Sequence, residues 1–179
     1  QLNKEGMHVI GVAAKKKSVG DTTVFHAEDE TNMTFLGIIA FLDPPKPDAK
    51  EAIRGLYDAG VHVKVISGDA PVVVEHVCKL VGMKVGDQRA VTGSDLENMS
   101  DAELSSVVEK NDIFARLSPM QKKRVVDALR NNGHVVGYMG DGVNDAPSLH
   151  DADVGISVDN ATDVAKASAD IILLEKSLT

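Results

Sequence analysis

The chain has 179 residues, a length typical of one domain or of one domain with part of another. Its 19 basic and 27 acidic residues give a formal net charge of −8, which argues against nucleic-acid binding because such domains usually carry a basic surface. Apolar residues make up 43% of the chain, enough for a hydrophobic core, and the single cysteine, Cys78, excludes a disulfide framework.

The first part of the chain differs in pattern from the rest. His8–Ala14 is predicted to be a strand, and residues 34–42 form a nearly continuous apolar run that stops at the sequence DPPKP. Three prolines in four positions cannot continue a strand, so we expect a stiff joint there. The predicted parts are residues 1–34, a hinge over 35–47 and a second domain over 48–179.

From residue 48 onward, helix and strand signals alternate along the chain. Capping boxes, which mark helix starts, are predicted at Asp48 with Glu51, Ser100 with Glu103, and Ser118 with Gln121. We predict helices over residues 48–59, 71–81, 100–110 and 118–132, and strands over 61–66, 113–117, 134–139, 154–158 and 171–174. This alternation predicts an α/β fold with a doubly wound, mostly parallel, Rossmann-like sheet. Ligands of such sheets bind beyond the carboxyl ends of the strands.

Two of these strand ends carry groups that suit an anion. Ser67, Gly68 and Asp69 follow a predicted strand, where a hydroxyl and free backbone N–H groups can bind an oxygen anion. The same residues are also ordinary in a plain strand-to-helix turn. Lys122 falls in the first turn of a predicted helix, where the macrodipole disfavours a cation unless it faces an anion such as phosphate. An exposed helix surface is the alternative for Lys122.

A third strand end carries paired carboxylates. Gly140 and Gly142 flank Asp141 and allow a tight turn, and Asp145 lies four residues on, with Asn144 between them. Two carboxylates and an amide suit a Mg²⁺ ion that keeps some of its waters, although an Asx-rich loop has the same residue types. A hydroxyl, a lysine and a carboxylate pair are the groups that phosphoryl transfer through an aspartyl phosphate needs.

These residues also carry a family resemblance. The run GDGVNDAPSL at 140–149, with SGD at 67–69 and DPPKP at 43–47, resembles the phosphorylation domain of P-type ATPases, which has the haloacid-dehalogenase fold. The resemblance covers nearly the whole chain, with residues 1–34 similar to the carboxyl-terminal end of the nucleotide-binding domain. The stretches FARLSPMQKKRVV and ISVDNATDVAKASADIILLEKSL most resemble bacterial magnesium transporters, and proton pumps are the nearest alternative within the family.

The resemblance implies a catalytic Mg²⁺ ion, with ATP as the substrate. Asp141 would be the chief protein ligand of the Mg²⁺, and Asn144 and Asp145 would complete and orient that metal site. The transported Mg²⁺ would bind elsewhere, in membrane helices that this chain does not include.

The other matched positions would bind phosphate. Ser67 would hold a phosphoryl oxygen, as the threonine of the family's usual TGD does, and Lys122 would neutralise the phosphoryl group. Gly68 and Asp69 would line the pocket near the nucleotide phosphates. Asp43 would support the hinge and the nucleotide end of the site.

One family motif is absent from the chain. The phosphate acceptor of the family is the aspartate of DKTGT, and this sequence has no DKTGT. The resemblance therefore implies a carboxyl-side fragment that lacks the acceptor strand and the nucleotide-binding, actuator and transmembrane domains. We expect it to be inactive alone, and to self-associate through sheet edges that the missing strand leaves open. The whole protein would work at the cytoplasmic face of the bacterial inner membrane.

Two interpretations outside ion transport remain at this point. The first is a free-standing soluble phosphatase of the same fold, for which Asp43 is the only candidate nucleophile near a first strand. Pro44 and Pro45 argue against it, because their missing N–H groups would spoil a phosphate-binding turn. The second is a non-catalytic interaction module, for which Asp141→Asn would not change Mg²⁺ binding.

Overall fold

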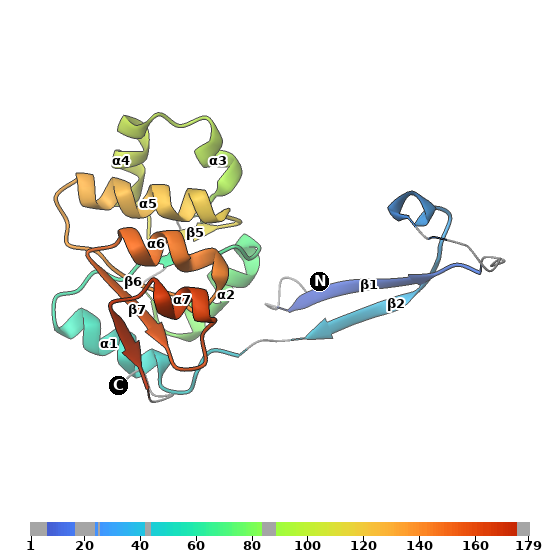
Figure 1. The fold of residues 1–179 in the computed structure, drawn as a ribbon, viewed down its shortest axis with the longest axis horizontal. Coiled ribbons are helices and arrows are strands. Elements are labelled where there is room, and N and C mark those ends of the chain that lie inside the picture. Colours follow the sequence, from blue (N-terminus) through green and yellow to red (C-terminus); the bar gives the residue numbers. More distant parts are fainter. Residues whose placement is uncertain (1–6, 17–23, 25, 42–43, 84–88, 175–179) are drawn as a thin grey trace. The chain divides into compact units, whose positions relative to one another are not determined.

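The computed structural model describes residues 7–16, 24, 26–41, 44–83 and 89–174 (Figure 1). The chain divides into two compact units, residues 1–43 and 44–179. The division falls later than residue 34 because the apolar run after that position forms a strand of the first unit. The assignment of each part to a particular ATPase domain stays a prediction.

The first unit contains a two-stranded antiparallel ribbon (Figure 1). Strand β1 (His8–Ala14) pairs with β2 (Thr34–Phe41), and the register shifts between Val12 and Ala13. A short 3₁₀ helix, η2 (Ala27–Asp29), lies between the two strands in sequence. Large apolar side chains of β2 are exposed within this unit, including Phe35 at 66%. A two-stranded ribbon is at best marginally stable alone.

The second unit contains two parallel three-stranded sheets. Their strands are β3 (Val65–Ile66), β4 (Val91–Thr92), β5 (Ile113–Ala115), β6 (Gly137–Met139), β7 (Val154–Val158) and β8 (Ile171–Leu173). Within the described residues the strand orders are β3-β5-β4 and β6-β7-β8, and every pairing is parallel. The predicted α/β class with parallel sheets is confirmed, and among the described residues β3, β4, β6 and β8 are edge strands.

Helices connect these strands (Figure 1). They are α1 (Ala49–Asp58), α2 (Pro71–Leu80), α3 (Gly93–Glu97), α4 (Asp101–Lys110), α5 (Pro119–Asn131), α6 (Ala146–Asp151) and α7 (Asp163–Ala167), with the 3₁₀ helix η3 (Val143–Asp145). No helix among the described residues is both long and apolar enough to span a membrane.

Two of the three predicted capping boxes are confirmed. Ser100 and Ser118 have extended backbones, and each side chain accepts a hydrogen bond from the backbone N–H three residues on. The prediction for Asp48 is wrong, because its backbone is already helical (φ −90°, ψ −5°) and its side chain makes no capping hydrogen bond. An N-cap residue needs an extended backbone to aim its side chain at the free N–H groups.

The core of the second unit consists of three apolar clusters. Neighbouring residues of α5 enter two of them, since Val125 packs in the cluster around Phe114 and Val126 packs in the cluster around Tyr138. Ile66, the last residue of β3, packs against both of these clusters. The end of β3 and strand β6 are therefore connected through a shared core.

The close approach of β7 to α6 generates the first prediction. A Cβ atom at Gly155 would lie 2.5 Å from the Leu149 carbonyl oxygen, whereas a Cβ at Gly137 of β6 would meet nothing closer than 3.9 Å. We expect Gly155→Ala to lower the free energy of unfolding by about 1–3 kcal/mol, because backbone must shift to relieve the overlap. Gly137→Ala is the control and should leave it within about 0.5 kcal/mol. Urea unfolding measures both, and equal effects would contradict the packing described here.

Candidate phosphoryl-transfer site

The centre of the candidate site is a buried ion pair. The Lys122 Nζ lies 2.7 Å from Asp145 Oδ1, and their side chains are 11% and 13% exposed. Lys122 comes from the first turn of α5, and Asp145 ends η3 just before α6. The sequence analysis selected both residues, and the structure brings them into direct contact.

Two further donors complete the surroundings of Asp145. The Tyr138 hydroxyl donates to Oδ1 at 2.9 Å, and the Gly142 backbone N–H donates to Oδ2 at 3.2 Å. Burial alone would raise the pKa of Asp145, but the Lys122 ammonium and these two donors outweigh it and hold that pKa below its usual range. Burial and the Asp145 carboxylate raise the pKa of Tyr138, so its hydroxyl keeps its proton and acts as a donor.

The glycine before Asp141 is required by this packing. A Cβ atom at Gly140 would lie 2.5 Å from the Cβ of Asp145 and 2.8 Å from its carboxyl carbon. Real Cβ atoms do not approach other atoms so closely, so a larger residue would displace the Asp145 side chain. Gly140 is therefore needed for the position of the ion pair.

Asp141 lies beside the ion pair but makes different contacts. Its backbone carbonyl accepts hydrogen bonds from Thr162 N at 3.0 Å and Thr162 Oγ1 at 3.3 Å. Its carboxylate is exposed, and no hydrogen bond or ion pair to it occurs within the described part of the chain. Asn144 is also exposed, on η3.

These residues fit a Mg²⁺ ion of the kind that binds with a substrate. The described residues contain no cluster of three or more histidine, cysteine, aspartate or glutamate side chains that would form a complete protein cage. Mg²⁺ usually binds through one or two carboxylates, several waters and the phosphates of its substrate. The free carboxylate of Asp141 supplies such an oxygen, whereas Asp145 Oδ1 already accepts two hydrogen bonds.

The serine and aspartate after β3 form a local hydrogen-bonded turn. The Ser67 hydroxyl donates to Asp69 Oδ2 at 3.1 Å and accepts from the Asp69 backbone N–H at 3.0 Å. Backbone bonds from Arg116 N to Asp69 O and from Leu117 N to Ser67 O tie this turn to the end of β5. Ser67 must exchange its bond to Asp69 for any bond it donates to a phosphoryl oxygen.

The predicted site residues thus form two groups. Lys122 and Asp145 are in contact, and so are Ser67 and Asp69, but no hydrogen bond or ion pair joins the groups within the described ranges. Packing relates them, because Ile66 precedes Ser67 and contacts the same cluster as Tyr138. Asp43, which was also predicted, lies outside the described residues.

Two residues near the site were not selected from the sequence. Tyr138 could have been found, since a tyrosine in a buried strand usually needs a hydrogen-bond partner for its hydroxyl. Arg116 gives no such signal, yet its backbone has a φ of 53°, a conformation rare for residues other than glycine. Its position follows from contacts that only the fold creates.

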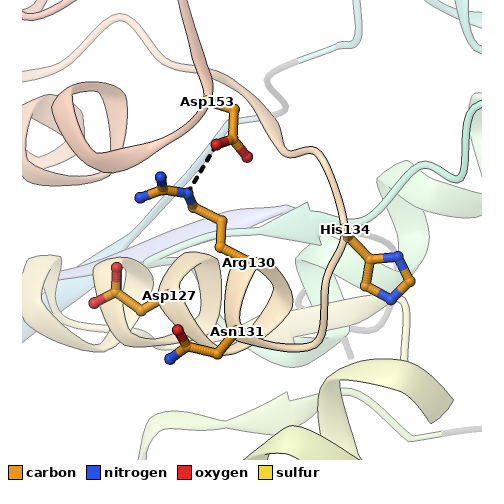
Figure 2. A pocket seen from close by; sticks show the side chains of 5 residues that line it. All are labelled: Asp127, Arg130, Asn131, His134 and Asp153. Carbon is orange, nitrogen blue, oxygen red and sulfur yellow. Dashed lines mark hydrogen bonds and ion pairs between the residues drawn. The ribbon is translucent and has the colours of Figure 1, made fainter.

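A surface hollow lies at the other end of α5 (Figure 2). It has a volume of about 370 Å³ and is lined by Asp127, Arg130, Asn131, His134 and Asp153. Figure 2 shows Arg130 reaching toward Asp153, and its Nε donates to Asp153 Oδ1 at 3.1 Å. The hollow adjoins the amino ends of β6 and β7, so it is not the site at the carboxyl ends of the strands.

Comparison with known proteins identifies the family of the chain. A family profile described as haloacid dehalogenase-like hydrolase matches residues 7–153. The chain belongs to this family. The match spans β1 through α6 and includes every candidate residue named above.

Relatives with similar sequences are ion-transporting ATPases. The chain is 54% identical, over 98% of its length, to "Magnesium-transporting ATPase, P-type 1" of Salmonella typhimurium, and 48% identical, over 99%, to the protein of that name from Escherichia coli K12. Identity to "Cation-transporting ATPase pma1" of Synechocystis is 38% over 97% of the chain. The chain spans 19% of the length of each of these relatives.

The buried ion pair generates the second prediction. Lys122→Met should lower the free energy of unfolding by about 3–5 kcal/mol, because it leaves the Asp145 carboxylate buried without a countercharge. Lys123→Met is the matched control, since Lys123 pairs at the surface with Asp127 and Asp151 and should cost only about 0.2–1 kcal/mol. Urea unfolding at neutral pH compares the two variants. A loss below 1 kcal/mol for Lys122→Met would contradict the burial of this pair.

Proposed function

We propose that this chain is the carboxyl-side catalytic part of the phosphorylation domain of a P-type ATPase that transports Mg²⁺. The observation that carries this proposal is the buried Lys122–Asp145 ion pair beside the free carboxylate of Asp141. It provides a fixed cation next to an oxygen ligand for a metal, the two requirements of phosphoryl transfer that a protein supplies by positioning. Identity of 54% to a magnesium transporter, against 38% to a cation transporter, favours Mg²⁺ as the transported ion.

Each candidate residue has a defined role in this proposal. Lys122 binds a phosphoryl oxygen with the ammonium N–H groups that Asp145 does not occupy, since an ammonium has three donors. Asp141 would be the chief ligand of the catalytic Mg²⁺, and Asn144 and Asp145 would complete and orient that site; the bound ion would neutralise charge on the phosphoryl group. The Ser67 hydroxyl would donate a hydrogen bond to another phosphoryl oxygen. Without substrate, it donates this hydrogen bond to Asp69.

Gly68 would line the pocket near the nucleotide phosphates at the end of β3. A Cβ atom there would meet the Leu117 carbonyl oxygen at 3.6 Å, so the backbone lies against the turn that follows β5. Asp69 lies beside it and would face the nucleotide phosphates. Asp43 is assigned to the hinge and the nucleotide end of the site by the family resemblance alone.

The phosphate acceptor belongs to a part of the polypeptide that this sequence does not contain. The chain has no DKTGT motif, and β3 and β6 are edge strands in the described residues. An edge strand has unpaired backbone donors and acceptors, so one further parallel strand can pair with β3, with β6 or with both. A parallel DKTGT strand paired with β3 would end near Ser67, and one paired with β6 would end near Asp141, so either pairing would bring the nucleophile to these residues.

In the whole protein this site would couple ATP hydrolysis to transport. ATP would transfer its terminal phosphoryl group to the DKTGT aspartate, and water would later release it as phosphate. Membrane helices elsewhere in the polypeptide would bind and move the transported Mg²⁺. The present chain would lie at the cytoplasmic face of the bacterial inner membrane and would be inactive when isolated.

The third prediction tests the proposal in the full-length polypeptide that contains this chain. We expect incubation with γ-labelled ATP and Mg²⁺, followed by an acid quench, to give a hydroxylamine-labile aspartyl phosphate. Asp141→Asn should lower the initial rate of labelling by about 100-fold or more, because the free carboxylate that would hold the Mg²⁺ is lost. Asp163→Asn is the control, since Asp163 is an exposed residue in the first turn of α7, and it should label like the wild type.

Labelling of the isolated chain tests whether the phosphate acceptor lies outside it. The 179-residue chain should take up no label, because it lacks the acceptor. A labelled aspartate in this chain would mean that it carries its own nucleophile, and the free-standing phosphatase would replace the proposal. Equal labelling of Asp141→Asn and wild type in the full-length protein would also contradict it.

A further inference from the structure

Tyr138 contacts the ion pair from strand β6. Its side chain is 7% exposed on β6, and its hydroxyl donates to the same Asp145 oxygen that accepts from Lys122. The two distances are 2.9 Å from the hydroxyl and 2.7 Å from the ammonium. A carboxylate oxygen has two lone pairs, so these two bonds saturate Oδ1.

The tyrosine restricts how the Asp145 carboxylate can rotate. Its ring packs in an apolar cluster with Val126 and Leu149, both fully buried, so the hydroxyl is held at one place. The Gly142 N–H donates to the other carboxylate oxygen at 3.2 Å. Rotation of the carboxylate would break bonds at both oxygens, and the tyrosine is the donor that shares Oδ1 with Lys122.

The direction of the Lys122 ammonium depends on this restriction. Lysine has a flexible side chain with four methylene groups, and its ammonium makes one hydrogen bond to a described residue, the bond to Asp145. If Oδ1 moves, the ammonium moves with it. A cation that must meet a phosphoryl group within a few tenths of an ångström needs a supported partner, because small displacements reduce the rate strongly.

We propose that Tyr138 is a positioning residue that holds Asp145 Oδ1 so that the Lys122 ammonium keeps one orientation toward the phosphoryl group. The orientation toward the phosphoryl group rests on the proposed function, whereas the order of the ammonium rests only on the contacts among Tyr138, Asp145 and Lys122. Tyr138 would act through Asp145 and Lys122, without touching the substrate or the metal.

The fourth prediction measures the order of the ammonium directly in the 179-residue chain. NMR relaxation of the Lys122 Nζ, with ¹⁵N-labelled lysine, should show a restricted ammonium in the wild type. Tyr138→Phe should lower its order parameter, because Oδ1 loses its rigid donor. Tyr57→Phe is the matched control, since Tyr57 is the only other tyrosine and lies on α1. An unchanged order parameter in folded Tyr138→Phe would overturn the proposal, as would an equal decrease in Tyr57→Phe.

Turnover in the full-length polypeptide tests the consequence for chemistry. Tyr138→Phe should lower kcat about 10-fold with little change in KM for ATP, because the ammonium acts on the transferred group and not on nucleotide binding. In a Lys122→Met background, Tyr138→Phe should have no further effect on kcat, since the tyrosine acts through the lysine. Measurements well below the melting temperature of each variant exclude a loss that reflects unfolding.

The outcomes separate the two proposals. Independent, multiplicative losses in the double variant would mean a structural role for Tyr138 and would overturn the inference. A wild-type full-length protein that forms no aspartyl phosphate would overturn the proposed function alone, and the NMR comparison would then decide whether Tyr138 orders the ammonium.

Discussion

The buried contact between Lys122 and Asp145 is the interaction on which the rest of the site depends. Removing two charges from water costs several kcal/mol per ion, so such a pair depends on good geometry and on further hydrogen bonds. Here the further bonds go to the carboxylate, from Tyr138 and Gly142, and Gly140 provides the space that the Asp145 side chain needs. Much of the GDGVND motif is therefore explained by one requirement, which is to hold the Asp145 carboxylate in contact with the Lys122 ammonium.

This arrangement also divides the work between the two aspartates of the motif. Asp145 is buried and accepts three hydrogen bonds, whereas Asp141 is exposed and its carboxylate makes no hydrogen bond or ion pair with the described residues. The first suits the positioning of a cation, and the second is open to a metal and a substrate. A tight turn between Gly140 and Gly142 allows both environments within five residues.

The fold was predictable where periodicity and helix-capping residues were strong. The bounds of His8–Ala14 and Val154–Val158 match the prediction, and capping boxes correctly predicted the starts of α4 and α5. The strand expected over residues 61–66 is only Val65–Ile66, because β3 pairs with the short strand β5 alone. Short elements such as α3, α6 and α7 have five or six residues, too few for a periodic pattern to identify them.

The sequence predicted which residues belong to the site but not which of them contact one another. Motif spacing selected Lys122 and Asp145 separately, one as a phosphate ligand and the other as a metal ligand. Their contact joins residues 23 positions apart through the packing of α5 against η3 and α6, which no local pattern reports. The participation of Tyr138 depends on the same packing, and the sequence offers only the general rule that buried hydroxyl groups need partners.

The proposed function requires that the ends of β3 and β6 form one metal-dependent site around Asp141. Paramagnetic broadening of backbone amide signals by Mn²⁺, used as a substitute for Mg²⁺ in the 179-residue chain, would locate this metal site. Broadening should be strongest at residues 140–145, extend to 67–69 and disappear in Asp141→Asn. Broadening that is centred on the hollow near Asp127 and Asp153, or that survives Asp141→Asn, would contradict this requirement.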